Sequence, residues 1–127
     1  MRISTYGRKV EVGGEVNLNP QLLHEINQLH AEICGGLADP KRIGLLYAMR
    51  EGATTVSQLA EALDLTQATV SRHLKVLRER GMVIARREGM NVYYSVSNEK
   101  ILRALDLLRE VLSEHLAQRG ALAEAIG

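Results

Sequence analysis

The residues best suited to a chemical role lie between positions 66 and 91, and they are hydrogen-bond donors and cations rather than nucleophile and base pairs. Over residues 66–80, Val70, Leu74 and Leu77 recur at helical spacing and define one apolar face. The opposite face carries glutamine and arginine, which are well suited to reading the edges of DNA bases. Since the major groove of B-DNA, about 12 Å wide, accepts one α-helix, we predict that this helix reads DNA. Its candidate DNA-binding residues are Thr66, Gln67, Thr69, Ser71, Arg72, His73 and Lys75.

The positive charge of the chain is concentrated in the same region. The formal net charge is only +1, but residues 65–94 carry six Lys or Arg and two Asp or Glu, whereas residues 17–64 carry three and six. The start of the helix at Thr66 also presents unpaired N–H groups and the positive end of the helix dipole, which favour a phosphate. Arg86, Arg87 and Asn91 extend the basic block, and we expect them to reach a neighbouring minor groove or the DNA backbone.

The elements around this helix decide between DNA binding and a simpler interpretation, a solvated face made of Arg72, Lys75, Arg78 and Arg80. Thr55 and Gln58 have the spacing of a capping box that begins a short helix. Asp64-Leu65-Thr66 connects it to the next helix, which Thr66 caps and Gly81 ends. Two short helices joined by three residues are typical of a helix-turn-helix, so the order of elements favours DNA binding.

A two-stranded wing is predicted directly after the helix-turn-helix. Residues 82–87 and 91–96 alternate β-branched and aromatic residues with polar ones. Glu88-Gly89-Met90 lies between them as a turn. The basic residues of this segment therefore lie near the tip of an antiparallel ribbon.

Further helices are expected on either side. Asn19-Pro20 begins a helix that Gly35-Gly36 ends, and Asp39-Pro40 begins another that runs to Arg50. From Asn98 onward a last helix carries more apolar side chains than one packing face needs, which indicates a partner. Because aromatic residues are scarce, the core suits packed helices. We predict a mainly α (α+β) fold, a winged helix-turn-helix with about five helices and a two-stranded β wing.

One domain is expected over residues 20–118. Residues 1–19 are expected to form a tail or a short hairpin that turns at Gly13-Gly14, and residues 119–127 a flexible C-terminal tail. The chain has one cysteine, Cys34, which excludes an intrachain disulfide, and it shows neither a signal sequence nor an apolar run of 18 residues. We therefore expect a cytoplasmic protein with no membrane partner.

Residues 36–112 resemble the ArsR/SmtB-type winged-helix repressors. The resemblance is densest in LADPKR (37–42), QLAEAL (58–63), TQATVSRHLKVL (66–77), and RREG (86–89) with Tyr93-Tyr94. It implies a homodimer joined through the first and last helices, which blocks transcription by binding operator DNA and is released when an inducer binds. The two-fold axis of such a dimer predicts an inverted-repeat operator.

The metal sites of that family are not expected here. Many of its members sense metals through paired cysteines on the first helix of the helix-turn-helix, where this chain has Val56-Ser57-Gln58, or through ligands on the last helix, where Lys100 replaces an imidazole. No cofactor is predicted. The remaining metal candidates are His30 and Cys34, spaced i, i+4, with His115 as a third ligand across a dimer. The alternative is that Cys34 is simply buried and that His30 lies at the surface or in an interface.

Three other functions compare differently with the sequence. An enzyme needs a nucleophile, a base and an orienting group, and the spacing of Ser57, His73 and Asp64 does not place them together, so no enzyme is expected. A winged helix that binds proteins predicts weak DNA binding without sequence preference. A regulator that acts without a ligand also agrees with the sequence.

Overall fold

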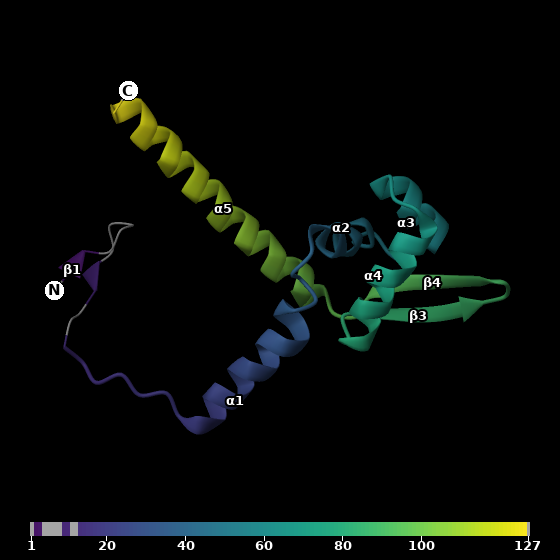
Figure 1. Ribbon diagram of the computed structural model, residues 1–127, viewed down its shortest axis with the longest axis horizontal. Coiled ribbons are helices and arrows are strands. Elements are labelled where there is room, and N and C mark those ends of the chain that lie inside the picture. Colours follow the sequence, from purple (N-terminus) through teal and green to yellow (C-terminus); the bar gives the residue numbers. More distant parts are fainter. Residues whose placement is uncertain (1, 4–8, 11–12, 127) are drawn as a thin grey trace.

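In the computed structural model the described residues are 2–3, 9–10 and 13–126. They form a mainly helical winged helix-turn-helix, as predicted (Figure 1). The helices are α1 (Pro20–Gln28), its π-helical continuation η1 (Leu29–Cys34), α2 (Pro40–Ala48), α3 (Val56–Leu63), α4 (Gln67–Glu79) and α5 (Glu99–Ile126). The strands are β1 (Arg2–Ile3), β2 (Lys9–Val10), β3 (Val83–Glu88) and β4 (Asn91–Val96).

The hydrophobic core lies where α2, α3 and α4 meet the base of the wing and the start of α5. Leu45 and Leu46 of α2 and Leu74 and Leu77 of α4 are fully or almost fully buried. Burial of a side chain of this size stabilises the fold by about 1.5–3 kcal/mol. The other buried apolar residues are Met49, Leu59, Ala60, Val70, Met82, Val83, Leu102 and Leu105. The core is therefore built from aliphatic side chains and methionine, in agreement with the scarcity of aromatic residues in the sequence.

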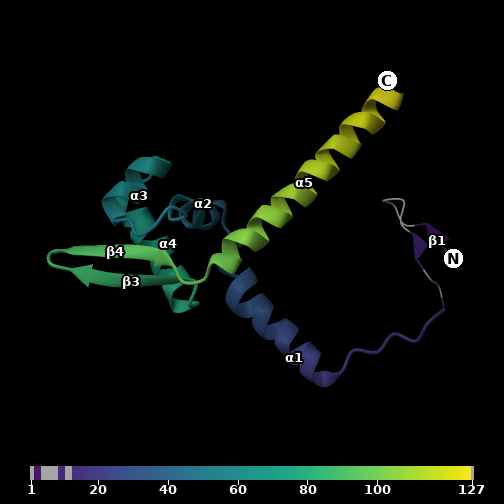
Figure 2. The ribbon, with the colours of Figure 1, turned by 180° about the vertical axis from the view of Figure 1, so that it is seen from behind.

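Two helical arms extend from this core in different directions, one formed by α1 with η1 and the other by α5 (Figures 1 and 2). α1 and η1 contain no buried residue, and Ile33 and Leu37 pack against the core where this arm ends. On α5, Leu102 and Leu105 are buried near its start. Each arm thus meets the core near one end. Although α5 has 28 residues, no helix of the described chain is both long and apolar enough to cross a membrane.

The wing is an antiparallel ribbon in which β3 and β4 pair from Val83 with Val96 to Glu88 with Asn91. Its turn consists of Gly89 and Met90, and Gly89 has a φ of +61°, which suits a residue without a Cβ. Glu88 was expected in the turn but lies in the strand. At the base of the wing, two backbone bonds of 2.9 and 2.7 Å join Thr54 to Tyr94 and anchor the ribbon to the loop before α3.

The two chain ends differ from the sequence-based expectation in two details, the turn at Gly13-Gly14 and the form of the C-terminal residues. The N-terminal pairing joins β1 to β2, whereas residues 14–19 form no strand, so Gly13-Gly14 does not turn a hairpin into that segment. Residues 11 and 12 of the expected hairpin lie outside the described residues. At the other end, α5 continues to Ile126, which places residues 119–126 in a helix rather than in a flexible tail.

A polar cluster attaches α5 to α2. The Tyr47 hydroxyl donates to Asp106 Oδ1 (2.9 Å), Arg50 donates to Asp106 Oδ2, and Arg109 Nη1 lies 3.7 Å from Oδ1. Both guanidinium groups also lie over the Tyr47 ring, at 5.2 and 5.3 Å from its centroid. The hydrogen bonds from Arg50 and Tyr47 hold the pKa of the Asp106 carboxyl below its usual value.

This cluster predicts a pH-dependent contribution to stability. Because the folded-state pKa of Asp106 is lowered, the cluster stabilises the folded chain above the ordinary carboxyl pKa of 3.8, and this stabilisation is lost as the pH falls through the lowered value. Asp106→Asn should therefore reduce the free energy of unfolding at neutral pH and have a smaller effect in acid. Urea unfolding across this pH range, at fixed protein concentration, measures the difference. Glu110→Gln on the same helix is the control, and an equal pH profile for both variants would contradict the prediction.

Candidate nucleic-acid interface

The turn between α3 and α4 is built by local hydrogen bonds. Thr55 and Gln58 form the predicted capping box at the start of α3, with the Gln58 N–H 3.2 Å from Thr55 Oγ1 and the Thr55 N–H 3.0 Å from Gln58 Oε1. α3 ends at Leu63, and its C-cap Asp64 has a left-handed φ of +53°, a conformation that aspartate tolerates better than most residues. The Leu65 N–H then donates to the Ala60 carbonyl (2.9 Å). These bonds fix the direction in which α4 leaves α3.

α4 has one buried and one exposed face, as the periodicity predicted. Val70, Leu74 and Leu77 are at most 1% exposed, so the helix cannot rotate without exposing them. The predicted groove-facing residues Gln67, Ser71, Arg72 and Lys75 are exposed, and Thr66 is exposed at the N-cap. Thr69 is half-buried beside them. The structure therefore brings these residues together on one side of α4.

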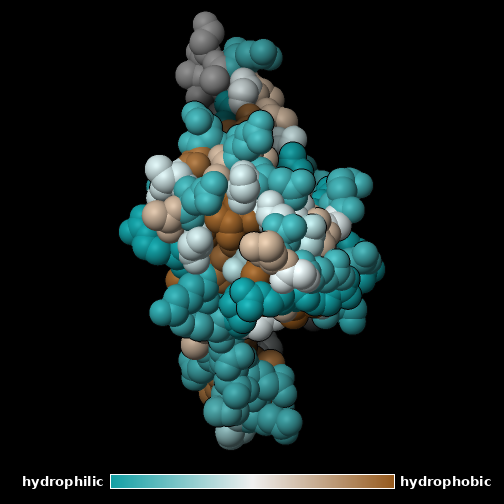
Figure 3. Space-filling view, turned by 90° about the vertical axis from the view of Figure 1, so that its right-hand side faces the viewer, coloured by the Kyte–Doolittle hydropathy of each residue, from teal (hydrophilic) through white to brown (hydrophobic). Residues whose placement is uncertain are grey.

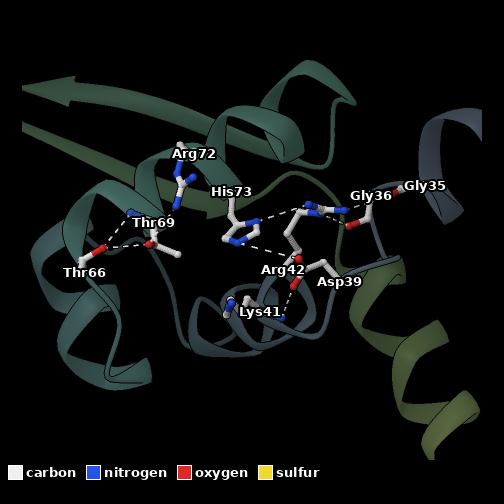
Figure 4. Close-up of polar contacts among 9 residues, drawn as sticks. All are labelled: Gly35, Gly36, Asp39, Lys41, Arg42, Thr66, Thr69, Arg72 and His73. Atoms are coloured by element: carbon white, nitrogen blue, oxygen red, sulfur yellow. Dashed lines mark hydrogen bonds and ion pairs between the residues drawn. The ribbon is translucent and has the colours of Figure 1, made fainter.

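Hydrogen bonds connect three of these side chains at the start of α4 (Figure 4). Thr66 Oγ1 accepts from the Thr69 N–H (3.1 Å) and donates to Thr69 Oγ1 (2.9 Å). Arg72 Nη2 in turn donates to Thr69 Oγ1 (3.2 Å). This bond uses one of the five N–H groups of the guanidinium, and it holds the cation near the N-terminal end of the helix. Thr69 thus orients Arg72.

His73 points in another direction, toward α2. Its side chain is only 16% exposed, with Nε2 4.0 Å from Asp39 Oδ2 and Nδ1 3.4 Å from Arg42 Nη1 (Figure 4). Asp39 caps α2 by accepting from the Lys41 N–H (2.8 Å), and this bond, more than the nearby histidine, lowers the pKa of its carboxyl. In the free chain, the flank of α4 that carries His73 therefore packs against the start of α2, and a contact of His73 with DNA stays a prediction.

The wing places its two arginines on opposite faces of the ribbon, because consecutive strand residues alternate. Arg86 Nη2 forms an ion pair with Glu88 Oε1 (2.8 Å) on one face, and the exposed Arg87 lies on the other. Asn91 and Met90 are exposed at the tip, Met90 by 97%. Seen from the wing end, the surface is mostly hydrophilic, with a small group of hydrophobic side chains near its centre (Figure 3).

The metal candidates do not assemble within the described chain. No group of three His, Cys, Asp or Glu residues there could hold a metal ion. Cys34 and His30 are both exposed on η1, so Cys34 is not buried in the single chain. His115 is half-buried on α5, the other arm.

Two residues with structural roles were not predicted. Arg42 of α2 and Arg80 at the C-cap of α4 bind backbone carbonyls at the end of the first arm. Arg42 belongs to the motif LADPKR, and the helical periodicity of the sequence assigns Arg80 no role beyond a solvated face. Nothing local in the sequence distinguishes an arginine that binds a distant carbonyl from one that faces water.

The helix-turn-helix, the wing and the polar face of α4 together define a DNA-binding transcriptional regulator of the winged-helix class. Residues 39–85 match the family described as bacterial regulatory protein, arsR family. The chain is 38% identical over 102 residues to the HTH-type transcriptional regulator CmtR of Mycobacterium tuberculosis, covering 76% of this chain and 86% of that protein. The chain belongs to the arsR family, whose members are transcriptional regulators rather than enzymes.

Two further comparisons agree with this assignment. The transcriptional repressor SmtB homolog of Synechocystis is 37% identical over 91 residues, which cover 72% of this chain and 66% of that protein. The homodimeric winged helix-turn-helix DNA-binding domain of Mb0332 from Mycobacterium bovis superposes with a TM-score of 0.68 and 29% identity, covering 82% of this chain and 95% of that one. Sequence and fold thus lead to the same family.

The cap at Thr66 gives a direct test of how the start of α4 is held. Thr66→Ala removes the hydroxyl that accepts from the Thr69 N–H, and we expect it to lower the free energy of unfolding by about 1 kcal/mol. Thr66→Ser keeps the hydroxyl oxygen and should cost only a small part of this. Chemical denaturation of both variants measures the difference, and equal losses would show that the cap bond does not stabilise α4.

Proposed function

We propose that the protein is a homodimeric transcriptional repressor that binds an inverted-repeat operator with α4 in the major groove. The observation that carries the proposal is the exposed polar face of α4, held opposite a fully buried apolar face by the core. A helix in a groove needs this division, because it must be supported from behind and must present hydrogen-bonding groups in front. Operator DNA places the site of action in the cytoplasm.

Base recognition is assigned to the exposed end of α4. Gln67 and Ser71 read base edges, and Arg72, oriented by Thr69, binds a base or an adjacent phosphate. Thr66 and the N–H groups at the start of α4 face a phosphate, and Lys75 adds an ionic contact farther along the helix.

The wing supplies contacts that position the protein without selecting a sequence. Arg87 is assigned to the DNA backbone or the minor groove, with Asn91 at the tip. Arg86 contributes less charge to DNA, because Glu88 forms an ion pair with it in the free protein. The two arginines of the wing are thus expected to differ in effect.

Dimerisation is assigned to the two arms, which expose large apolar side chains on the single chain. On α1 and η1 these are Leu22, Leu23, Ile26 and Leu29, and on α5 they are Leu107, Leu108, Val111, Leu112 and Leu116. An apolar surface of this extent on a soluble regulator indicates a protein partner, and the related Mb0332 domain is homodimeric. A two-fold dimer then requires half-sites about one helical turn of DNA apart, or a multiple of it.

The proposal includes release from the operator by an inducer. The name of the Synechocystis relative, a transcriptional repressor, supports repression, and the resemblance to the ArsR/SmtB-type repressors supports release by a ligand. The metal-ligand sets of that family are replaced in this chain. The inducer is therefore assigned to another chemical class or to another part of the dimer.

The assignment of α4 predicts a sequence-specific loss of affinity for Gln67→Ala. Without the side-chain amide, the variant should bind the operator about 1–3 kcal/mol more weakly and should discriminate less at one base pair. Fluorescence anisotropy on the operator and on single-base variants measures both effects. Unchanged affinity and unchanged base preference would favour the alternative of a winged helix that binds proteins.

The wing predicts a different effect for Arg87→Ala, which should weaken binding to all DNA sequences alike. The slope of log K against log salt should fall by about one unit, because one phosphate contact is lost. Arg86→Ala is the matched comparison and should change the slope less, since Glu88 already neutralises that charge. A larger change for Arg86→Ala would refute this division of roles.

The dimer assignment predicts that Leu108→Asp weakens dimerisation and operator affinity together. The substitution places a charge within the apolar face of α5, where desolvation opposes contact. Ser113→Asp adds the same charge next to the polar residues Arg109 and Glu110 and serves as the control. Sedimentation equilibrium and operator titration measure the two properties. A Leu108→Asp monomer that keeps full operator affinity would disprove the dimeric mode of binding.

A further inference from the structure

The arm formed by α1 and η1 is attached at its C-terminal end to α4 through Arg80. This residue is the C-cap of α4, and its Nη1 donates to the Ala31 carbonyl and lies 3.5 Å from the Glu32 carbonyl oxygen. The π-helical turn supplies these acceptors. The Gly35 N–H donates to the His30 carbonyl, five residues back (2.9 Å). In an α-helix it would donate to the Ala31 carbonyl, so the π-helical turn leaves that carbonyl available to Arg80. A cation on α4 thus binds the negative end of the arm's helix dipole.

Arg42 makes a second connection between the same two helices. Its Nε donates to the Gly36 carbonyl (2.8 Å) and its Nη2 to the Gly35 carbonyl (3.3 Å). On its other side, Nη1 lies 3.4 Å from Nδ1 of His73 on α4 (Figure 4). The arm is therefore joined to α4 directly through Arg80 and indirectly through Arg42 and His73.

The glycine pair at the end of the arm permits this close approach. A Cβ on Gly35 would lie 2.6 Å from Arg80 Nη1 and 2.9 Å from the Ala31 carbonyl oxygen, and a Cβ on Gly36 would lie 2.6 Å from Met82 Sδ. A side chain at either position would therefore require the Arg80 guanidinium, the Met82 side chain or the arm itself to move. The pair does more than end a helix, which was all that the sequence predicted.

The apolar contacts of the arm with the rest of the described chain lie near its end. α1 and η1 have no buried residue, and the apolar contacts of the arm with the core come from Ile33 and from Leu37 just beyond it. Apolar contacts are non-directional, whereas charge-assisted hydrogen bonds are short and about twice as strong as neutral ones. The two arginines therefore supply directional side-chain contacts between the arm and the rest of the described chain.

We propose that Arg80, together with Arg42, is a positioning residue that sets the half-site spacing accepted by the dimer. The arm carries part of the proposed dimer interface and α4 carries the DNA contacts, so the angle between them sets the distance between the two α4 helices. The two-fold axis repeats any change of this angle in both subunits. This inference rests on the proposed function, because spacing has meaning only for a dimer that reads two half-sites.

The test compares Arg80→Gln with Arg78→Gln, which removes the same charge from the same end of α4. No bond from Arg78 to the arm is present in the described chain. The probe is the duplex that the unmodified protein selects from random DNA, with the half-site separation kept, shortened or lengthened by one base pair. Arg80→Gln should reduce the preference for the selected spacing by roughly tenfold. Arg78→Gln should change affinity equally for all three duplexes.

A variant that leaves every charge unchanged shows whether the spacing preference depends on the position of the arm or on the charge of Arg80. Gly35→Ala keeps every charge but places a methyl group against Arg80, so it should cause the same loss of spacing preference. Thermal unfolding and sedimentation equilibrium verify that each variant is folded and dimeric, properties that the positioning role leaves intact. If Arg80→Gln does not fold, Arg42→Gln, which removes the second connection, replaces it in the comparison.

The outcomes distinguish the inference from the function on which it rests. If folded, dimeric Arg80→Gln and Gly35→Ala retain the spacing preference of the unmodified protein, the positioning role is refuted and the proposed function stands. If the unmodified protein binds DNA as a monomer or without preference for spacing, the proposed function fails and the inference fails with it.

Discussion

The burial of one face of α4 is the constraint on which the rest of the structure depends. Val70, Leu74 and Leu77 occupy the centre of the core, and successive helix residues are rotated by about 100°. Their burial therefore determines that Gln67 and Ser71 face solvent. A shift of the helix by one residue would expose leucine and bury polar side chains, which costs free energy in both directions. The surface assigned to DNA is thus a consequence of the core, and α2, α3 and the wing serve to hold that core together.

Arginine side chains join the parts that the apolar core does not reach. Arg50, just after α2, binds Asp106 of α5, and Arg42 and Arg80 connect α2 and α4 with the carbonyl end of the arm formed by α1 and η1. Guanidinium groups suit this task because their several donors lie in one rigid plane. Within the basic segment of the chain, Arg80 therefore binds carbonyl groups of the same chain, whereas Arg72 and Arg87 remain exposed to solvent. The formal net charge of +1 does not show which arginines bind groups of the same chain and which remain exposed.

Features specified by local interactions were predictable from the sequence, and features specified by distant contacts were not. The caps at Thr55 and Thr66 follow from residues three positions apart, and the wing follows from two alternating segments separated by a short turn; the structure confirms them. The orientation of His73 depends on how α2 packs against α4, and helical periodicity places it only on a flank. Likewise, Gly120 weakens a helix by about 1 kcal/mol, yet the alanine-rich segment around it stays helical to Ile126. The DNA contacts themselves stay a prediction.

The length of α5 has a mechanical consequence. With a rise of about 1.5 Å per residue, its 28 residues extend for about 42 Å, while its buried anchors, Leu102 and Leu105, lie in the first two turns. The helix is therefore a lever with its pivot in the DNA-binding core. A tilt of about 5° at the pivot moves the far end, about 34 Å away, by about 3 Å. Conversely, a displacement of several ångströms between the far ends of the two α5 helices rotates the start of α5 by only a few degrees relative to the core. A small force at the far end therefore exerts a large torque at Leu102 and Leu105.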